Sequence, residues 1–207
     1  MKKKILFIML ASLSLVGLFA QNKVKPSSKI ALYAGVDMGY SGANLISDIT
    51  SGFYGGFEVT PYFGIKPFVK MPGISFEMAV QMDFLRRTEG NFAYDFSIIT
   101  PQLLVAYNGN IGKLRPFIKA GVGVNINSGK QIFTYENFSS TDKINSTPSI
   151  SFVLNPGMEF KLTNMISLIG FGRFNYNLTN LSIDGELDAK DIFIGTQSFG
   201  FGTKLNF

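Results

Sequence analysis

The sequence predicts an all-β fold: an eight-stranded antiparallel up-and-down β-barrel that spans a membrane, preceded by a cleaved signal peptide. The final ten residues, 198–207, alternate between two kinds of side chain, which is the period of a strand and not of a helix. One face carries Phe199, Phe201, Thr203, Leu205 and Phe207. The other face carries Ser198, Gly200, Gly202, Lys204 and Asn206. Other segments repeat this alternation, behind a secretion signal and in a chain without Cys or His.

Residues 1–20 are predicted to be the signal peptide. Lys2, Lys3 and Lys4 precede an apolar run that ends at Ala20, as in a secretory signal cut after a small residue. An uncleaved membrane anchor is the alternative, but the run is shorter than the ~20 residues that a spanning helix needs. The rest of the chain, 21–207, is predicted to be one barrel domain.

Composition fits a membrane barrel better than a soluble protein. Hydrophobic residues make up 46% of the 207 residues and charged residues 16%, with 21 Phe and 22 Gly. Aromatic residues suit a lipid-facing surface, and glycines suit strongly curved strands. The signal holds three of the 19 basic residues, which leaves 16 basic against 14 acidic residues. This near balance gives no indication of a nucleic-acid partner.

The first three strands are predicted at 29–40, 52–64 and 74–85. In the first, the even-numbered residues from Ile30 to Tyr40 share one face. Pro61 lies inside the second and weakens that assignment. The third alternates most clearly, and as a strand it places Glu77 and Asp83 on the same side. Its opposite side carries Ile74, Phe76, Met78, Val80, Met82 and Phe84.

The fourth and fifth strands are predicted at 92–107 and 115–127. The alternation of the fourth changes phase near Pro101, so we expect a one-residue bulge there that turns both Phe96 and Val105 outward. In the fifth, Lys119 and three small or polar residues face inward. Its outward residues are Ile118, Ala120, Val122, Val124 and Ile126.

The last three strands are predicted at 150–162, 166–178 and from about 192 to the end. Phe152 and Phe174 face outward, whereas Glu159 and Arg173 face inward. The predicted connections alternate in length, which orients the barrel with both chain ends in the periplasm. The external loops are then 41–50, 88–91, 128–148 and 179–191, and short turns near residues 69, 111 and 164 face the periplasm.

The strands must close into a ring. Each is long enough for the ~9 to 11 tilted residues that cross a bilayer. Lipid offers no hydrogen-bonding partner to an open sheet edge, so the last strand is expected to pair with the first. Ten strands in place of eight would reopen the question of a pore.

Three segments resemble a known family. The runs 96–107, 114–124 and 154–160 are similar to those of small outer-membrane β-barrel ("porin family", OmpA- and OmpX-like) proteins. The residues Gly202, Leu205 and Phe207 resemble the terminal signature by which the barrel assembly machinery recognises such proteins. The resemblance implies outer-membrane lipid and that machinery as partners, and the outer membrane of a diderm bacterium as the location.

The lumen of the predicted barrel is expected to be filled by charged side chains. Eight strands enclose a space that inward side chains nearly fill, whereas aqueous channels appear at about 16 strands. Unpaired ions there are costly, so we expect opposite charges to pair. A narrow ion or small-solute channel is the alternative. The predicted lumen charge network consists of Glu58, Glu77, Asp83, Arg87, Asp95, Lys119, Glu159, Lys161 and Arg173.

Several kinds of chemistry are absent from the sequence. Without His or Cys, a Ser-His-acid triad, a Cys nucleophile and a His/Cys metal site are all excluded. Glu77 and Asp83 leave a paired-carboxylate site open, but an ion network with neighbouring cations is the more common use of such residues. We therefore expect neither an enzyme nor a cofactor or metal site.

The long connection 128–148 is the candidate ligand-binding loop. Its large apolar side chains either bind a host or cell-surface ligand, as exposed aromatic residues can, or fold down to cap the barrel. They are Ile132, Phe133, Tyr135 and Phe138. The expected role is thus structural or surface-interactive, and a soluble secreted barrel or lipocalin-like binder is a further alternative.

Overall fold

The computed structural model describes residues 30–46, 52–67, 73–135, 138–146, 148–178, 183–184 and 193–207. The predicted signal peptide, 1–20, lies outside these residues. Within them, no helix is long and apolar enough to cross a bilayer. The strands are β1 (Ala31–Ile46), β2 (Gly52–Lys66), β3 (Ile74–Glu89), β4 (Phe92–Asn108), β5 (Leu114–Tyr135), β6 (Phe138–Ser146), β7 (Ser149–Lys161), β8 (Ile166–Asn177), β9 (Ile183–Asp184) and β10 (Phe193–Asn206).

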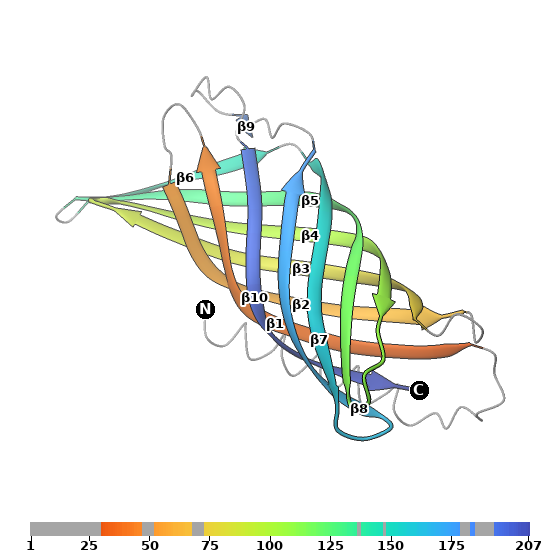
Figure 1. Cartoon of the computed structure of the whole chain (residues 1–207). Helices are drawn as coiled ribbons and strands as arrows, with labels where there is room; N and C mark the ends of the chain where they lie inside the picture. The colour runs from red at the N-terminus through yellow and green to blue at the C-terminus, as the bar shows by residue number, and fades with distance from the viewer. Residues whose placement is uncertain are drawn as a thin grey trace.

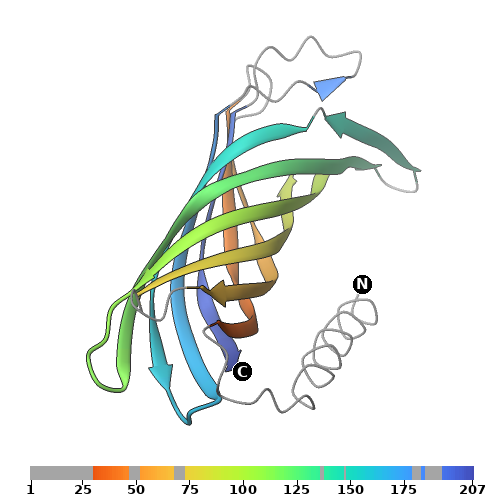
Figure 2. The same cartoon turned by 90° about the vertical axis from the view of Figure 1, so that its right-hand side faces the viewer.

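Eight of these strands form a closed antiparallel ring, as predicted. The order around the wall is β1, β2, β3, β4, β5, β7, β8 and β10, and the wall is seen from two sides in Figures 1 and 2. The first and last strands pair from Tyr33↔Asn206 to Ile46↔Phe193. No edge of the ring is therefore left to face lipid, which is the condition for a sheet to span a bilayer.

The connection predicted at 128–148 is largely β-structure instead of a loop. β5 continues to Tyr135, and β6 pairs back along it from Tyr135↔Phe138 to Ser128↔Asn145. β7 then pairs with the lower part of β5, starting at Asn125↔Ser149. β6 is in effect the outer continuation of β7, and the ring keeps eight strands.

Except in the first half of β4, the two faces of the wall are as predicted. The lipid-side residues Phe76, Met78 and Phe152 are 42%, 60% and 42% exposed. Glu77 and Glu159, on the other face, are 3% and 1% exposed. Because the side-chain period of a strand is two, this alternation fixes the register of every strand in the ring.

The predicted bulge beside Pro101 is wrong. β3 and β4 pair with one constant register from Ile74↔Tyr107 to Glu89↔Phe92, so Phe96 faces inward and is buried. The same behaviour is found at three prolines, Pro61, Pro101 and Pro156. Each proline pairs with one of its two neighbouring strands, whereas the ladder with the other neighbour is interrupted beside it. Beyond the interruption, the strands pair again in the same register. A proline removes one ladder donor, and here this loss needs no extra residue.

The wall is taller than predicted at the end that is expected to face the cell exterior, which we call its outer end. The loop expected at 41–50 begins later, because β1 continues to Ile46. The tight turn predicted at 88–91 is shorter, because β3 continues to Glu89 and β4 begins at Phe92. Its Gly90 has φ of 57°. Gly112, in the predicted turn near residue 111, has φ of 63°. Both turns need the left-handed conformation, which glycine adopts without steric cost.

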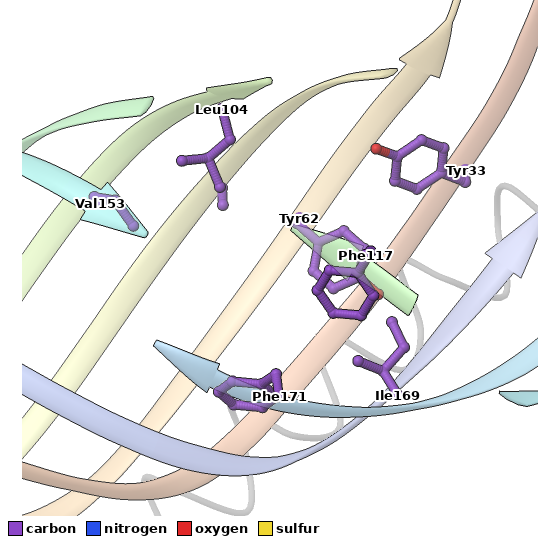
Figure 3. Close-up of a cluster of buried hydrophobic side chains, with 8 residues drawn as sticks. Tyr33, Tyr62, Leu104, Phe117, Val153, Ile169 and Phe171 are labelled. Carbon is purple, nitrogen blue, oxygen red and sulfur yellow. The ribbon is translucent and has the colours of Figure 1, made fainter. Parts of the chain in front are cut away.

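An apolar and aromatic cluster fills part of the lumen (Figure 3). Its members come from seven strands, so they tie distant parts of the wall together across the interior. They are Tyr33, Tyr62, Ala79, Leu104, Phe117, Val153, Ile169 and Phe171. Tyr33 and Tyr62 meet edge to face, with ring centroids 6.3 Å apart. The lumen is therefore a packed core, which is typical of eight-stranded barrels.

The lipid face can be tested with one charge at two depths. Leu103, 61% exposed, lies in the middle of the outward face, whereas Ser128 lies near its outer end. We expect Leu103→Arg to lower the free energy of unfolding by about 2–4 kcal/mol, and Ser128→Arg by less than about 1 kcal/mol, because the cost depends on depth. Urea unfolding in lipid vesicles, with the folded fraction monitored by heat-modifiable gel migration, measures the unfolding free energy of both variants. Equal costs would contradict a lipid-facing Leu103.

Candidate functional site: the barrel lumen and the outer hairpin

Three cations are buried in the described part of the lumen, and each is paired with a carboxylate. Lys119 Nζ lies 2.8 Å from Glu77 Oε1, and Lys204 Nζ lies 2.6 Å from Glu159 Oε2. Each of these four side chains comes from a different strand, so the pairs bridge the lumen. Their side chains are at most 6% exposed. The predicted pairing of charges inside the barrel is confirmed.

Arg173 is the third cation and the best connected. Its Nη2 lies 3.1 Å from Asp37 Oδ2, and its Nη1 donates to Glu58 Oε1 and, over 2.6 Å, to Thr60 Oγ1. The Asn155 amide, oriented to satisfy its neighbours, accepts from Nε and Nη2. The planar guanidinium supplies several donors in a fixed fork, which suits it to hold two carboxylates at once.

Arg173 also connects the two sides of the seam between β1 and β10, where the ring closes. It belongs to β8, whereas Asp37 belongs to β1 and Glu58 to β2. β10 lies between β8 and β1, and its Ser198 hydroxyl donates to Glu58. The ring is thus joined at this seam twice, by the β1–β10 backbone ladder in the wall and by ion pairs on its inner surface.

Each buried cation also lies over an aromatic ring. Lys119 Nζ is 4.4 Å from the centroid of Tyr62, and Lys204 Nζ is 4.5 Å from that of Tyr33. The Arg173 guanidinium is 4.9 Å from the ring centroid of Phe171. The negative face of a ring attracts a cation, and the attraction is stronger where water is excluded. The apolar cluster and the charge network therefore stabilise each other.

The described lumen holds more acids than cations. Asp37, Glu58, Glu77, Asp83 and Glu159 are all buried, against the three cations. Asp83 is held by neutral donors: Ser41 Oγ donates to it over 2.6 Å and Gln81 Nε2 over 2.9 Å. The same Gln81 amide donates to Glu58 over 3.2 Å, so it joins the two acids.

Six residues of the predicted network lie in the buried lumen, and three do not. Glu58, Glu77, Asp83, Lys119, Glu159 and Arg173 are each at most 4% exposed. Arg87 faces inward but lies nearer the outer mouth, where it pairs with Glu89 at 2.8 Å and covers the Tyr54 ring. Lys161 also has inward register, but it is only half-buried at the end of β7.

Asp95 faces outward, so its predicted place in the lumen is wrong. Its carboxylate lies 3.6 Å from Arg86 and 3.6 Å from Lys130, both on the outer surface of the wall. The false prediction follows from the false bulge, because the expected change of phase reversed the faces of the first half of β4. The outward charge is tolerated because this part of β4 lies beyond the rows of aliphatic side chains.

Two buried members were missing from the predicted network. Asp37 pairs with Arg173, and Lys204 pairs with Glu159. Both occupy the polar side of their strands in the period-2 pattern, which places them inside. Selecting every charged residue with inward register would have found them. With Asp37 and Lys204 included, the lumen charge network consists of Asp37, Glu58, Glu77, Asp83, Lys119, Glu159, Arg173 and Lys204.

The outer hairpin, formed by residues 128–135 of β5 and by β6, carries the candidate ligand residues. Phe133, Tyr135 and Phe138 share its inner face by strand register, whereas Ile132 lies on the opposite face. Tyr135 and Phe138 pair at the tip and are 55% and 63% exposed. The structure thus favours a standing hairpin over loop residues that fold down to cap the barrel.

An aromatic column descends from this hairpin toward the lumen. The rings of Phe133 and Phe92 lie 4.9 Å apart, and Phe92 is 6.5 Å from Tyr94. Tyr94 meets the ring of Tyr54 at 6.3 Å, and Tyr54 meets Phe96 at 5.4 Å. The column becomes more buried with depth, from a Phe92 that is 38% exposed to a Tyr54 that is 2% exposed. It therefore presents apolar surface at the outer mouth and lines the lumen below it.

The predicted assembly residues lie at the end of β10. Gly202 faces the lumen, where a Cβ atom would lie 2.1 Å from Asp37 Oδ1, so no other residue fits without a shift. Leu205 pairs with Ala34 and Ile166 in the wall. The Phe207 amide donates to the Leu32 carbonyl over 2.9 Å and extends the seam by one bond.

The lumen chemistry is that of a structural network. The Glu77 carboxylate accepts from Lys119 and from Tyr33, whereas Asp83 binds Ser41 and Gln81. The two acids therefore have separate partners instead of forming the joint site that general acid/base catalysis would need. Among the described residues, no group of three acidic side chains is placed to hold a metal ion.

Removing the central cation tests this network. We expect Arg173→Met to lower the free energy of unfolding by about 3–5 kcal/mol, because two carboxylates lose their partner where water is scarce. The control Arg86→Met removes a cation that is 60% exposed and should cost less than about 1 kcal/mol. Urea unfolding of the refolded barrels measures both. A cost for Arg173→Met as small as that of the control would contradict a tightly paired lumen.

Comparisons with known proteins agree with this geometry. The family model described as an outer membrane protein beta-barrel domain matches residues 9–207. No curated protein sequence matches the chain.

Among solved structures, Neisserial surface protein A is similar at a TM-score of 0.57 and 15% identity, over 87% of this chain and 98% of that one. OprG from Pseudomonas aeruginosa gives a TM-score of 0.52 at 12% identity, over 87% and 96% of the two chains. A major outer membrane protein from Thermus thermophilus gives 0.53 at 15% identity, over 84% and 99%. The chain is thus an integral protein of the bacterial outer membrane, and it belongs to the outer-membrane protein β-barrel domain family.

Proposed function

We propose that this protein is a non-conducting, non-catalytic barrel that serves as a rigid support for a surface-binding hairpin. The observation that carries the first half is the lumen charge network. Its ion pairs join β3 to β5, β7 to β10, and β8 to β1 and β2. With the apolar cluster, these bridges fill the space that a solute path would need.

Conductance in planar bilayers tests the closed lumen. We expect the refolded protein to be silent across a range of salt concentrations, because its charges are paired across the interior. The triple variant Glu58→Ala, Gln81→Ala, Arg173→Ala removes side chains from the middle of this network and should give measurable current. Its heat-modifiable migration confirms that it is folded. Steady conductance of the unchanged protein would support the narrow channel instead.

The second half of the proposal, ligand binding by the outer hairpin, rests on the aromatic column. Tyr135 and Phe138 are exposed at the hairpin tip, and the rings of Phe133, Phe92 and Tyr94 continue below them. Exposed aromatic side chains are costly in water and are common anchors in binding sites. Because residues 128–133 of the hairpin pair with β4 of the wall, little ordering is needed when a ligand binds. A host or cell-surface ligand is the class that this position suits.

Substitution of the two tip residues tests binding without deleting the hairpin. We expect Tyr135→Ser with Phe138→Ser to reduce retention of protein-bearing vesicles on immobilised cell-surface glycans and matrix proteins at least tenfold. The matched control, Ser139→Ala with Thr141→Ala, changes the opposite face of β6 and should leave retention unchanged. Both variants should keep heat-modifiable migration. Equal retention by both variants would contradict a role for the aromatic column.

We also propose that Gly202, Leu205 and Phe207 serve as the assembly signal read by the barrel assembly machinery. Their support is positional: the strand that holds them closes the ring against β1. The backbone of Phe207 lies just beyond the last ladder pair, at the end of the seam.

A further inference from the structure

A row of charged side chains crosses the surface of the wall that faces away from the barrel axis. Arg86 of β3 pairs with Asp95 of β4, Asp95 with Lys130 of β5, and Lys130 with Lys143 of β6. Cross-strand partners share a face, so all four residues point away from the barrel axis. We call this set the basic row, and its net charge is +2.

The single acid does not neutralise the row. Asp95 lies 3.6 Å from each of Arg86 and Lys130, which are 60% and 50% exposed. Ion pairs of this length between exposed groups are weak. Lys143 is exposed and stands directly beside Lys130, so two like charges face each other across the β5–β6 ladder. Such a pair is destabilising. Asp95 lies on the opposite side of Lys130 from Lys143, so an anion from outside the protein could stabilise the pair by lying beside Lys143.

The height of the basic row matches the lipid headgroups. The outermost aliphatic row is Met82, Ile99 and Ile126, and the next is Phe84, Ser97 and Ser128. The basic row follows two residues beyond Phe84. At ~3.3 Å per residue and a tilt of about 40°, each charged residue of β3, β4 and β5 lies about 5 Å above the residue of the Phe84 row on its own strand. The headgroup layer is about 5–8 Å thick on each side of the hydrocarbon core.

We propose that the basic row binds the phosphate groups of an anionic lipid in the outer leaflet. The row is continuous with the lipid-facing surface, so a lipid whose acyl chains pack on Ile99 and Ile126 would present its headgroup to Lys130 and Lys143. Arg86 adds a forked donor suited to phosphate oxygens. The side chains of Arg and Lys can extend along the wall toward the headgroup plane. This inference needs only the membrane-spanning barrel and does not depend on ligand binding by the outer hairpin.

Titration of diphosphoryl lipid A into the barrel refolded in neutral detergent tests the proposal, with bound lipid counted by native mass spectrometry. Each cation near an anionic membrane surface contributes about a fivefold change in affinity. We therefore expect Lys130→Gln with Lys143→Gln to weaken binding roughly 25-fold. Lys130→Gln alone should weaken it about fivefold, and Asp95→Asn should tighten it about fivefold because a repelling carboxylate is lost.

The controls separate a lipid site from general charge. Lys113→Gln removes an exposed lysine from the turn at the opposite end of the barrel and should change affinity less than twofold. Heat-modifiable migration confirms folding of every variant. Equal losses for Lys130→Gln and Lys113→Gln, or a weakening by Asp95→Asn, would overturn the proposal. So would binding of phosphatidylcholine as tight as that of lipid A, or displacement of the lipid by a soluble sulfated polysaccharide at equal charge concentration, which would identify a soluble polyanion as the ligand.

Discussion

A charge that faces the inside of a narrow barrel must find its partner across the lumen, and much of this structure depends on that constraint. An unpaired ion would be costly there, and breaking a buried pair costs far more than its net contribution to stability. Lys119, Arg173 and Lys204 each meet a carboxylate from another strand and an aromatic ring from the surrounding cluster. The interior thereby specifies which strands face each other, in addition to the ladder in the wall.

The outer surface follows from the same register. Because a slip by one residue would exchange the two faces of a strand, the inward acids fix the outward position of apolar residues such as Met78 and Phe152. The prolines inside β2, β4 and β7 do not disturb this relation, since pairing resumes in the same register beyond each of them. Charge inside and hydrocarbon outside are therefore two consequences of one alignment.

Strand alternation predicted the ring and most of the lumen, but it failed where apolar character did not distinguish lipid from protein. Phe96 and Ile98 are apolar and face inward, because the outer part of the lumen is lined by the aromatic column. The prediction that Phe96 faces lipid required a bulge in β4 that does not exist. The same bulge placed the neighbouring Asp95 on the wrong face of the strand. The outer hairpin was missed for another reason: a polar strand outside the membrane has the composition of a loop, and only its pairing with β5 identifies it.

The position of Arg173 has a consequence for how the protein matures. Its two carboxylate partners lie in the first third of the chain, on the far side of the last strand. Before β10 pairs with β1, the sheet is open. The Arg173 guanidinium then lies unpaired near one edge of the sheet, and the carboxylates of Asp37 and Glu58 lie unpaired near the other edge. When β10 pairs with β1, the exposed backbone edges and the unpaired charges find their partners in the same step. A partly paired sheet is therefore little more stable than separate strands. Insertion into lipid should accordingly proceed as a single all-or-none step.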